Sequence, residues 1–259
     1  IACRSAKYFF SCNPEGENHW FYQKWIREPP EGTVIIHFTM EDNPILTPDM
    51  IRRTRMMFSG VFYRRYILGQ WCAAEGVVYP MFDETCIGAP RAPCTRFVIS
   101  MDYGIQNPTA MLLWGFSDGV WYQLDEYYHS GRDSGVQKTD QEYYEALVRL
   151  AGNRPIDRVV IDPSASSFIA LVRQKGQFRV QKAKNAVRDG IQQTAAALSS
   201  GKLKISPQCV STIREYGSYV WGRDDTPVKD NDHAMDATRY FVATMGILRE
   251  RQRRQPVFL

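Results

Sequence analysis

The pattern of hydrophobic and polar positions changes character near residue 93. From there onward, apolar runs typical of buried strands alternate with amphipathic segments that carry helix start and stop signals. The expected strands cover residues 95–104, 109–116, 119–128, 157–164, 178–183 and 203–206, and the expected helices cover 138–152, 166–176, 186–202, 207–220 and a final segment from 232. Three consecutive strands followed by alternating helices and strands predict an α/β domain with a mixed sheet.

Residues 1 to about 92 have a different texture, with many aromatic residues, prolines and arginines and only short expected elements. Strands are expected at 7–14 and 32–39, a helix at 18–26, and another helix near Pro48 with Thr47 as its N-cap. Segment 86–94 carries two prolines and a glycine, which is typical of a linker. The chain opens on Ile1 in what looks like the middle of a strand, so we expect a fragment.

Composition restricts the function only weakly. Hydrophobic residues make up 44% and charged residues 23% of 259, as in an ordinary globular protein, and no apolar run approaches the roughly 18 residues that a membrane span needs. No secretory signal opens the chain, so we expect a cytosolic protein without a membrane partner. The six cysteines lack CxxC spacing, which argues against a zinc site or a disulfide framework. A net charge of +4 points weakly to a polyanion, and basic groups at 51–57, 63–66 and 248–255 point to one more strongly.

An acidic group with one of the four histidines stands at the start of the last expected helix, in DNDHAMDATRY at 230–240. Asp230 or Asp232 could cap the helix, since acidic residues favour its positive end. Asp236 lies beyond the first turn, and in a helix it shares a face with His233 and Asp232. Capping alone therefore leaves two interpretations, a salt-bridged surface or part of a metal site.

Two further aspartates end expected strands. Asp102 closes the first strand and Asp162 the fourth, and their carboxylates converge if those strands are parallel neighbours. Each alone could be a turn residue, because DYG and DPS are ordinary turn openings. Converging carboxylates favour Mg²⁺ or Mn²⁺, which suits two-metal phosphodiester hydrolysis. Three interpretations of His233 then remain: it is a ligand to a second ion, a proton shuttle or a surface residue.

The motifs VISMDYG, VVIDPSA and DNDHAMDATRY, preceded by YILGQWCAAEGVVYPMFD at 66–83, together resemble one known family. They look like the C-terminal nuclease domain of the large terminase subunit of tailed bacteriophages, which has an RNase H-like (retroviral integrase-like) fold. The resemblance covers nearly the whole chain. It implies a two-metal site with Mg²⁺ or Mn²⁺ held by Asp102, Asp162 and Asp236, with His233 as a further catalytic residue. Asp232 has no certain counterpart and is a candidate auxiliary residue.

The resemblance also divides the chain. It implies the C-terminal part of an ATPase domain with a linker at 1–75, a connecting segment at 76–92, the nuclease domain at 93–252 and a tail at 253–259. Residues 8–25 are similar to the closing part of that ATPase domain, where a strand ends in a Ser/Thr-x-Asn-Pro turn. The sequence contains no GxxxxGK[ST] loop, so we expect no ATP hydrolysis by this chain.

The implied function is a metal-dependent endonuclease that cuts concatemeric double-stranded viral DNA with little sequence preference, in the cytoplasm of the host cell. The portal protein and the small terminase subunit are implied partners. Lys182, Lys184, Arg188 and Lys229 are the candidate phosphate contacts. Segment 222–231 is either a mobile flap or an ordinary loop. Two alternatives remain, another RNase H-like nuclease of the junction resolvase or transposase type, and a non-catalytic DNA-docking module of the packaging motor.

Overall fold

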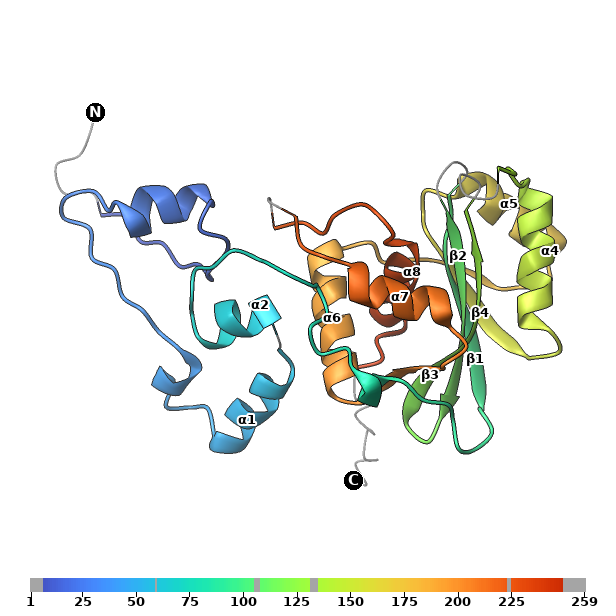
Figure 1. Ribbon diagram of the computed structural model, residues 1–259. Helices are drawn as coiled ribbons and strands as arrows, with labels where there is room; N and C mark the ends of the chain where they lie inside the picture. Colours follow the sequence, from blue (N-terminus) through green and yellow to red (C-terminus); the bar gives the residue numbers. More distant parts are fainter. Residues whose placement is uncertain (1–6, 59, 105–107, 131–134, 223–224, 249–259) are drawn as a thin grey trace, which may run out of the picture.

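The computed structural model describes residues 7–58, 60–104, 108–130, 135–222 and 225–248. Figure 1 shows an open N-terminal part built from short helical segments, beside a twisted sheet that carries helices on both faces. Across these described ranges, no helix is long and apolar enough to cross a membrane.

One sheet of six strands forms the centre of the larger part, in the order β5-β4-β1-β2-β3-β6. The strands are β1 (Arg96–Asp102), β2 (Thr109–Ser117), β3 (Val120–His129), β4 (Ile156–Ile161), β5 (Val180–Lys182) and β6 (Leu203–Ile205). β1, β2 and β3 form an antiparallel meander, whereas β4 runs parallel to β1, β5 to β4, and β6 to β3. The prediction of a mixed α/β sheet is confirmed.

Local sequence signals account for several of these elements. Asp118 and Gly119 join β2 to β3 and have φ angles of 49° and 81°, as a tight hairpin turn between twisted strands requires. The long helix α4 begins with a capping box, in which Thr139 accepts from the backbone of Glu142 and the Glu142 side chain accepts from the backbone of Thr139. Both features were predicted and are present.

Helices cover the sheet on both faces, which explains the almost unbroken burial of β2. On one face lie α4 (Asp140–Ala151) and α5 (Ser166–Lys175), and on the other lie α6 (Val187–Ser199), α7 (Val210–Ser218) and α8 (His233–Met245). Trp114 of β2 anchors the second face. Its ring stacks on Phe241 of α8 at 4.3 Å, and its indole N–H donates to Ser100 Oγ at 2.8 Å.

The N-terminal part is mostly short turns and helical segments. These are η1 (Tyr22–Arg27), η2 (Met40–Asp42), α1 (Pro48–Met56), α2 (Gly60–Phe62), η3 (Tyr63–Ile67) and η4 (Glu84–Cys86). The helices expected at 18–26 and near Pro48 are present, and Thr47 caps α1 by accepting from the N–H of Met50.

The two strands expected in the N-terminal part are wrong. In the described portion of the chain, residues 7–14 and 32–39 form no strand, and apolar side chains such as Phe9 and Val34 are 89% and 82% exposed. A strand is stable only where a neighbour satisfies its backbone groups and covers its apolar face. Among the residues that the structure describes, no strand or bridge pairs with either segment.

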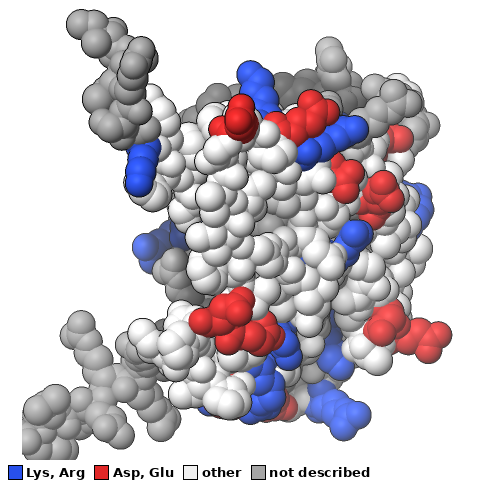
Figure 2. All heavy atoms as spheres, turned by 90° about the vertical axis from the view of Figure 1, so that its left-hand side faces the viewer, with Lys and Arg blue, Asp and Glu red and all other residues white. Residues whose placement is uncertain are grey.

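Four of the five arginines in the basic groups at 51–57 and 63–66 pair with acids. Arg52 and Arg53 pair with Asp49, and Arg55 pairs with Glu41. Arg65 is buried and pairs with Asp225 at 2.5 Å, which ties η3 to the loop before α8. Figure 2, which views the molecule from the side of the N-terminal part, shows small scattered groups of charge on a mainly uncharged face. The third basic group, 248–255, lies outside the described residues apart from Leu248.

Candidate active site

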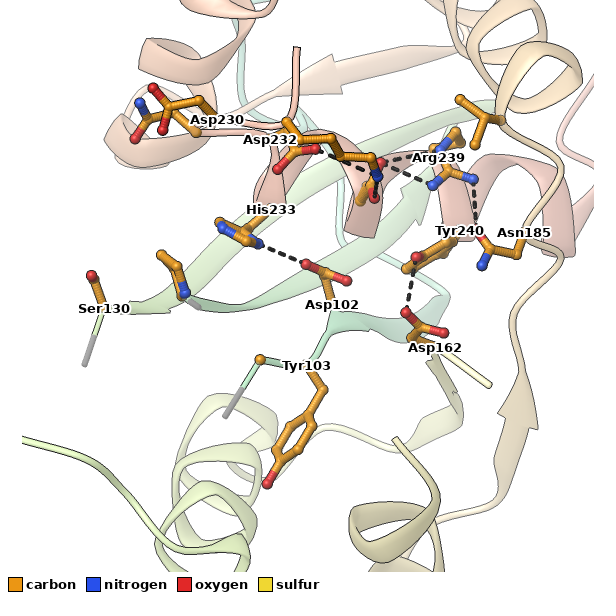
Figure 3. A pocket seen from close by; sticks show the side chains of 16 residues that line it. Asp102, Tyr103, Ser130, Asp162, Asn185, Asp230, Asp232, His233, Arg239 and Tyr240 are labelled. Carbon is orange, nitrogen blue, oxygen red and sulfur yellow. Dashed lines mark hydrogen bonds and ion pairs between the residues drawn. The ribbon is translucent and has the colours of Figure 1, made fainter. Parts of the chain in front are cut away.

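The ends of β1 and β4 place two aspartates at one edge of the sheet. Met101 pairs with Ile161 in the parallel ladder, so Asp102 and Asp162 leave neighbouring strands at the same edge. Side chains alternate along a strand, and Val98 and Val160 face the core formed with α8. Asp102 and Asp162 have the same parity and point toward that helix (Figure 3). The predicted convergence depended on parallel neighbours, and these strands are parallel neighbours.

Helix α8 supplies the remaining predicted residues. His233 begins it, and Asp236 follows one turn later on the same face. Asp232 occupies the N-cap position, but its side chain makes no capping hydrogen bond. Glu215 of α7 caps the helix instead, since its Oε2 accepts from the N–H groups of Ala234 at 2.7 Å and Met235 at 3.1 Å. Because the helix begins at His233, Asp236 lies within its first turn and not beyond it as expected, but the capping hydrogen bonds come from Glu215 and not from Asp232.

These side chains line one cavity of about 530 Å³. The predicted residues Asp102, Asp162, Asp232, His233, Asp236 and Lys229 all belong to its wall, together with Asp230, Tyr103, Asn185, Arg239 and Tyr240 (Figure 3). Sequence positions separated by more than a hundred residues thus meet at the C-terminal ends of β1 and β4, beside the first turns of α8.

Each of the three predicted ligands has a partner on α8. His233 Nδ1 lies 2.9 Å from Asp102 Oδ2, and the hydroxyl of Tyr240 donates to Asp162 Oδ2 at 3.1 Å. Arg239 Nη2 lies 2.9 Å from Asp236 Oδ1. The helix therefore holds all three carboxylates in place.

Burial and neighbouring carboxylates raise the pKa of two acids of the cavity, Asp102 and Asp232. Burial raises the pKa of Asp102 to about 6, and the charges of Asp236 and Asp162 add to it, while the hydrogen bond from His233 acts in the opposite sense. Burial and the charge of Asp236 likewise raise the pKa of Asp232. Burial disfavours the charged form of His233, but its hydrogen bond to Asp102 raises its pKa overall. The cavity therefore has an excess of negative charge that a cation would relieve.

The donor set fits a divalent cation in its chemistry. Mg²⁺ and Mn²⁺ prefer carboxylate oxygens, bind few of them directly, and complete their shells with water and phosphate oxygens. However, among the residues that the structure describes, no three His, Cys, Asp or Glu side chains are grouped closely enough to hold an ion as they stand. The carboxylates share one cavity but are turned toward their partners on α8.

The four candidate phosphate contacts are not brought together. Lys229 lines the cavity, with its side chain 76% exposed and its Nζ 3.9 Å from both Asp232 and Asp236. Lys182, Lys184 and Arg188 are exposed but are not part of the cavity wall, and Arg188 pairs with Glu15.

Segment 222–231 is only partly described. Residues 223–224 lie outside the described residues, and a bridge pairs Trp221 with Pro227. Its role as a flap stays a prediction.

The sequence did not predict Tyr103, Asn185, Arg239 or Tyr240, which also line the cavity. A signal for Arg239 existed, because an arginine stands within the otherwise apolar helix that follows Asp236, and buried arginines are rare unless they are paired.

Comparisons with known proteins point to one family. Residues 2–86 match the family model described as terminase large subunit, T4likevirus-type, N-terminal. The terminase large subunit of Escherichia phage T5 is 23% identical over 264 residues, covering 93% of this chain and 59% of that protein. A large terminase from a thermophilic bacteriophage, solved with ADP, is 46% identical with a TM-score of 0.87, over 94% of this chain and 63% of its own. The chain thus spans about three-fifths of these relatives.

Isolated nuclease domains share the fold of the sheet. The P22 large terminase nuclease domain has a TM-score of 0.55 at 19% identity, over 66% of this chain and 93% of that domain. The large terminase nuclease of the thermophilic phage G20c, solved with magnesium, has a TM-score of 0.50 at 13% identity, over 66% of this chain and 98% of its own.

One prediction is corrected by these structures. The missing GxxxxGK[ST] loop led us to expect no ATP hydrolysis, but the large terminase that is 46% identical to this chain was solved with ADP and with ATP-gamma-S. Because this chain spans only 63% to 64% of those structures, a loop that is missing from residues 1–259 gives no ground for excluding ATPase activity, and the prediction is wrong. With a T4likevirus-type terminase match in its N-terminal part and the sheet of the terminase nucleases in the rest, the chain belongs to the terminase large subunit family and carries its RNase H-like fold.

Proposed function

We propose that residues 93–252 form a divalent-metal-dependent endonuclease that cuts double-stranded DNA during packaging of a phage genome. The observation that carries the proposal is the meeting of Asp102, Asp162 and Asp236 with His233 in one cavity at the ends of two parallel strands. Residues 1–75 would close an ATPase domain, 76–92 would connect the two parts, and 253–259, outside the described residues, would be a tail.

The three aspartates are the proposed ligands for Mg²⁺ or Mn²⁺, and Asp232, in the same cavity, is a candidate auxiliary residue. When bound, a pair of such ions would activate the attacking water and stabilise the leaving oxygen of the phosphodiester. The magnesium in the G20c nuclease supports this choice of cation.

His233 is the proposed proton donor. Its Nδ1 lies 2.9 Å from Asp102, and this contact raises the pKa of the ring despite its burial, which favours the protonated form. A ring held in this way can keep a proton at Nε2 and release it to the leaving oxygen. Asp102 would then act twice, as a ligand and as the group that orients the imidazole.

DNA would be held mainly through its phosphates. Lys229 at the cavity, with the exposed Lys182, Lys184 and Arg188, would make binding depend on salt rather than on base sequence. Such contacts would give cutting with little sequence preference, and concatemeric viral DNA is the proposed substrate. The portal protein and the small terminase subunit as partners, and the host cytoplasm as the place of action, belong to the same proposal.

A non-catalytic DNA-docking module is the second candidate function. It is favoured by the arrangement of the carboxylates, each of which already has a partner on α8. As a result, no three His, Cys, Asp or Glu side chains of the described ranges are arranged to hold an ion. Such a module would bind DNA without cutting it.

Cleavage of supercoiled plasmid with manganese, magnesium or EDTA separates the two. We expect nicking and linear product with metal, and none with EDTA or in Asp162→Asn. Asp157→Asn is the matched control, because Asp157 lies at the opposite end of the β4 ladder and pairs with Arg96 on the neighbouring strand. A folded wild-type chain that binds DNA with metal present and never cuts it would favour the docking module.

A further inference from the structure

Arg239 is the most completely buried charged side chain at the site, with 1% of its surface exposed. Its Nη2 and Nε lie 2.9 Å and 3.3 Å from the same oxygen, Asp236 Oδ1. Its Nη1 donates to Asn185 Oδ1 at 3.2 Å, and its guanidinium carbon lies 4.7 Å from the ring centre of Tyr240 (Figure 3). Three different neighbours therefore fix the plane of the guanidinium.

The stem of the arginine is fixed as well. Helix α6 passes it at Gly190, where a Cβ would lie 2.4 Å from Arg239 Cγ and 2.8 Å from Cδ. No other residue type fits there unless the arginine moves, so glycine is required by the close approach of the two helices. The contacts of the guanidinium and of the aliphatic part of the side chain together hold Arg239 in one conformation.

Two proposed metal ligands depend on this one side chain. Arg239 pairs with Oδ1 of Asp236, while the one partner of Oδ2 among the described residues is Lys229 Nζ, 3.9 Å away. The Tyr240 ring that stacks under the guanidinium carries the hydroxyl that donates to Asp162 Oδ2. Asp236 and Asp162 are thus joined through the Arg239–Tyr240 pair.

Stability alone gives little reason for the arrangement. Burying a charged pair costs desolvation that the attraction often fails to recover, and an apolar side chain of similar size usually serves as well. Residues that hydrogen-bond a metal ligand, in contrast, orient it and strongly affect metal affinity.

We propose that Arg239 is a positioning residue of this site, which turns Asp236 so that Oδ2 is the oxygen offered to a divalent cation and which holds Asp162 beside it through Tyr240. The inference rests on the proposed function. It assigns to Arg239 no contact with DNA and no part in proton transfer.

Binding of Mn²⁺ alone to the full chain, measured by isothermal titration calorimetry without DNA, tests the inference. Arg239→Lys keeps the positive charge and loses the planar fork, so a change in affinity reports position rather than charge. We expect Mn²⁺ to bind about 10- to 100-fold more weakly. Gly190→Ala, which displaces the stem, should weaken binding in the same direction. Gly217→Ala in α7, where a Cβ meets nothing within 4 Å, is the matched control and should bind as the wild type does.

Asn185→Ala provides a second test if the buried variants fail to fold. The Asn185 side chain is exposed, so its removal should not prevent folding. It removes one hydrogen bond to Arg239 and should weaken Mn²⁺ binding by about two- to tenfold. Wild-type affinity in folded Arg239→Lys, or in Asn185→Ala if the former does not fold, overturns the inference. A wild-type chain that binds no Mn²⁺ overturns instead the metal site of the proposed function, and the inference with it.

Discussion

Glu215 on α7 holds the start of α8, and its ionisation should make the stability of the domain depend on pH. The side chain is fully buried. It accepts hydrogen bonds from the N–H groups of Ala234 and Met235, and from the hydroxyl of Tyr128 at 2.7 Å. Burial raises the pKa of Glu215 from 4.5 to about 7, even though these hydrogen bonds act in the opposite sense.

The size and sign of the effect follow from that pKa. Because the folded chain holds the proton more tightly than the unfolded chain, the stabilising contribution is complete below pH 4.5 and is lost as the pH rises through about 7. The interval between the two values corresponds to about 3 kcal/mol of unfolding free energy. Glu215→Gln removes the ionisation and keeps the shape, so this loss should disappear in the variant.

Urea unfolding followed by circular dichroism, in EDTA at about pH 5 and about pH 8, measures the difference. Between these two pH values the wild type should lose about 2.5 kcal/mol more than Glu215→Gln does, because part of the contribution is already lost at pH 5. Glu145→Gln on the exposed side of α4 is the control and should follow the wild type. If wild type and Glu215→Gln depend equally on pH, burial does not govern this carboxyl group and the reasoning is refuted.

Three further predictions concern packing, capping and DNA contact. Trp114→Ala removes the ring stacked on Phe241 and should lower the unfolding free energy by about 3–5 kcal/mol in urea titrations, whereas a loss below about 1 kcal/mol would contradict the packing described for β2 and α8. Thr139→Ala breaks the capping box of α4 and should cost about 1 kcal/mol in the same assay, with no change in metal-dependent cleavage. Lys229→Ala should reduce the slope of log affinity against log salt for duplex DNA by about 1 in fluorescence anisotropy, equally for unrelated sequences, and an unchanged slope would remove Lys229 from the DNA contacts.

The sheet and its two aspartates were predictable because strand physics is local in this region. Long apolar runs bounded by turn residues identified β1, β2 and β4, and period-two alternation places Asp102 and Asp162 on the same side as their buried neighbours. The roles of these aspartates remain predictions, since the geometry gives their position and not their chemistry.

What the pattern missed depends on partners distant in the sequence. Segments 7–14 and 32–39 have strand-like composition, but composition alone does not supply a neighbouring strand. The bond from Tyr240 to Asp162 depends on how α8 crosses the end of β4, and the fixed position of Arg239 depends on the approach of α6 at Gly190. Capping of α8 by Glu215, which belongs to a different helix, could not be predicted from the residues around the start of α8 either.

The contact between His233 and Asp102 joins residues 131 positions apart, and it brings the last described helix onto the first strand of the sheet. Contacts of such long range form late, because the intervening chain must lose conformational entropy before the contact can stabilise the fold. The β1–β3 meander, the helices that connect the later strands, and α8 all have to pack together first. Only then do Asp102, Asp162, Asp236 and His233 face one another. A chain still emerging from the ribosome has no assembled site, so under the proposed function a newly made terminase is harmless to the DNA around it until α8 is in place.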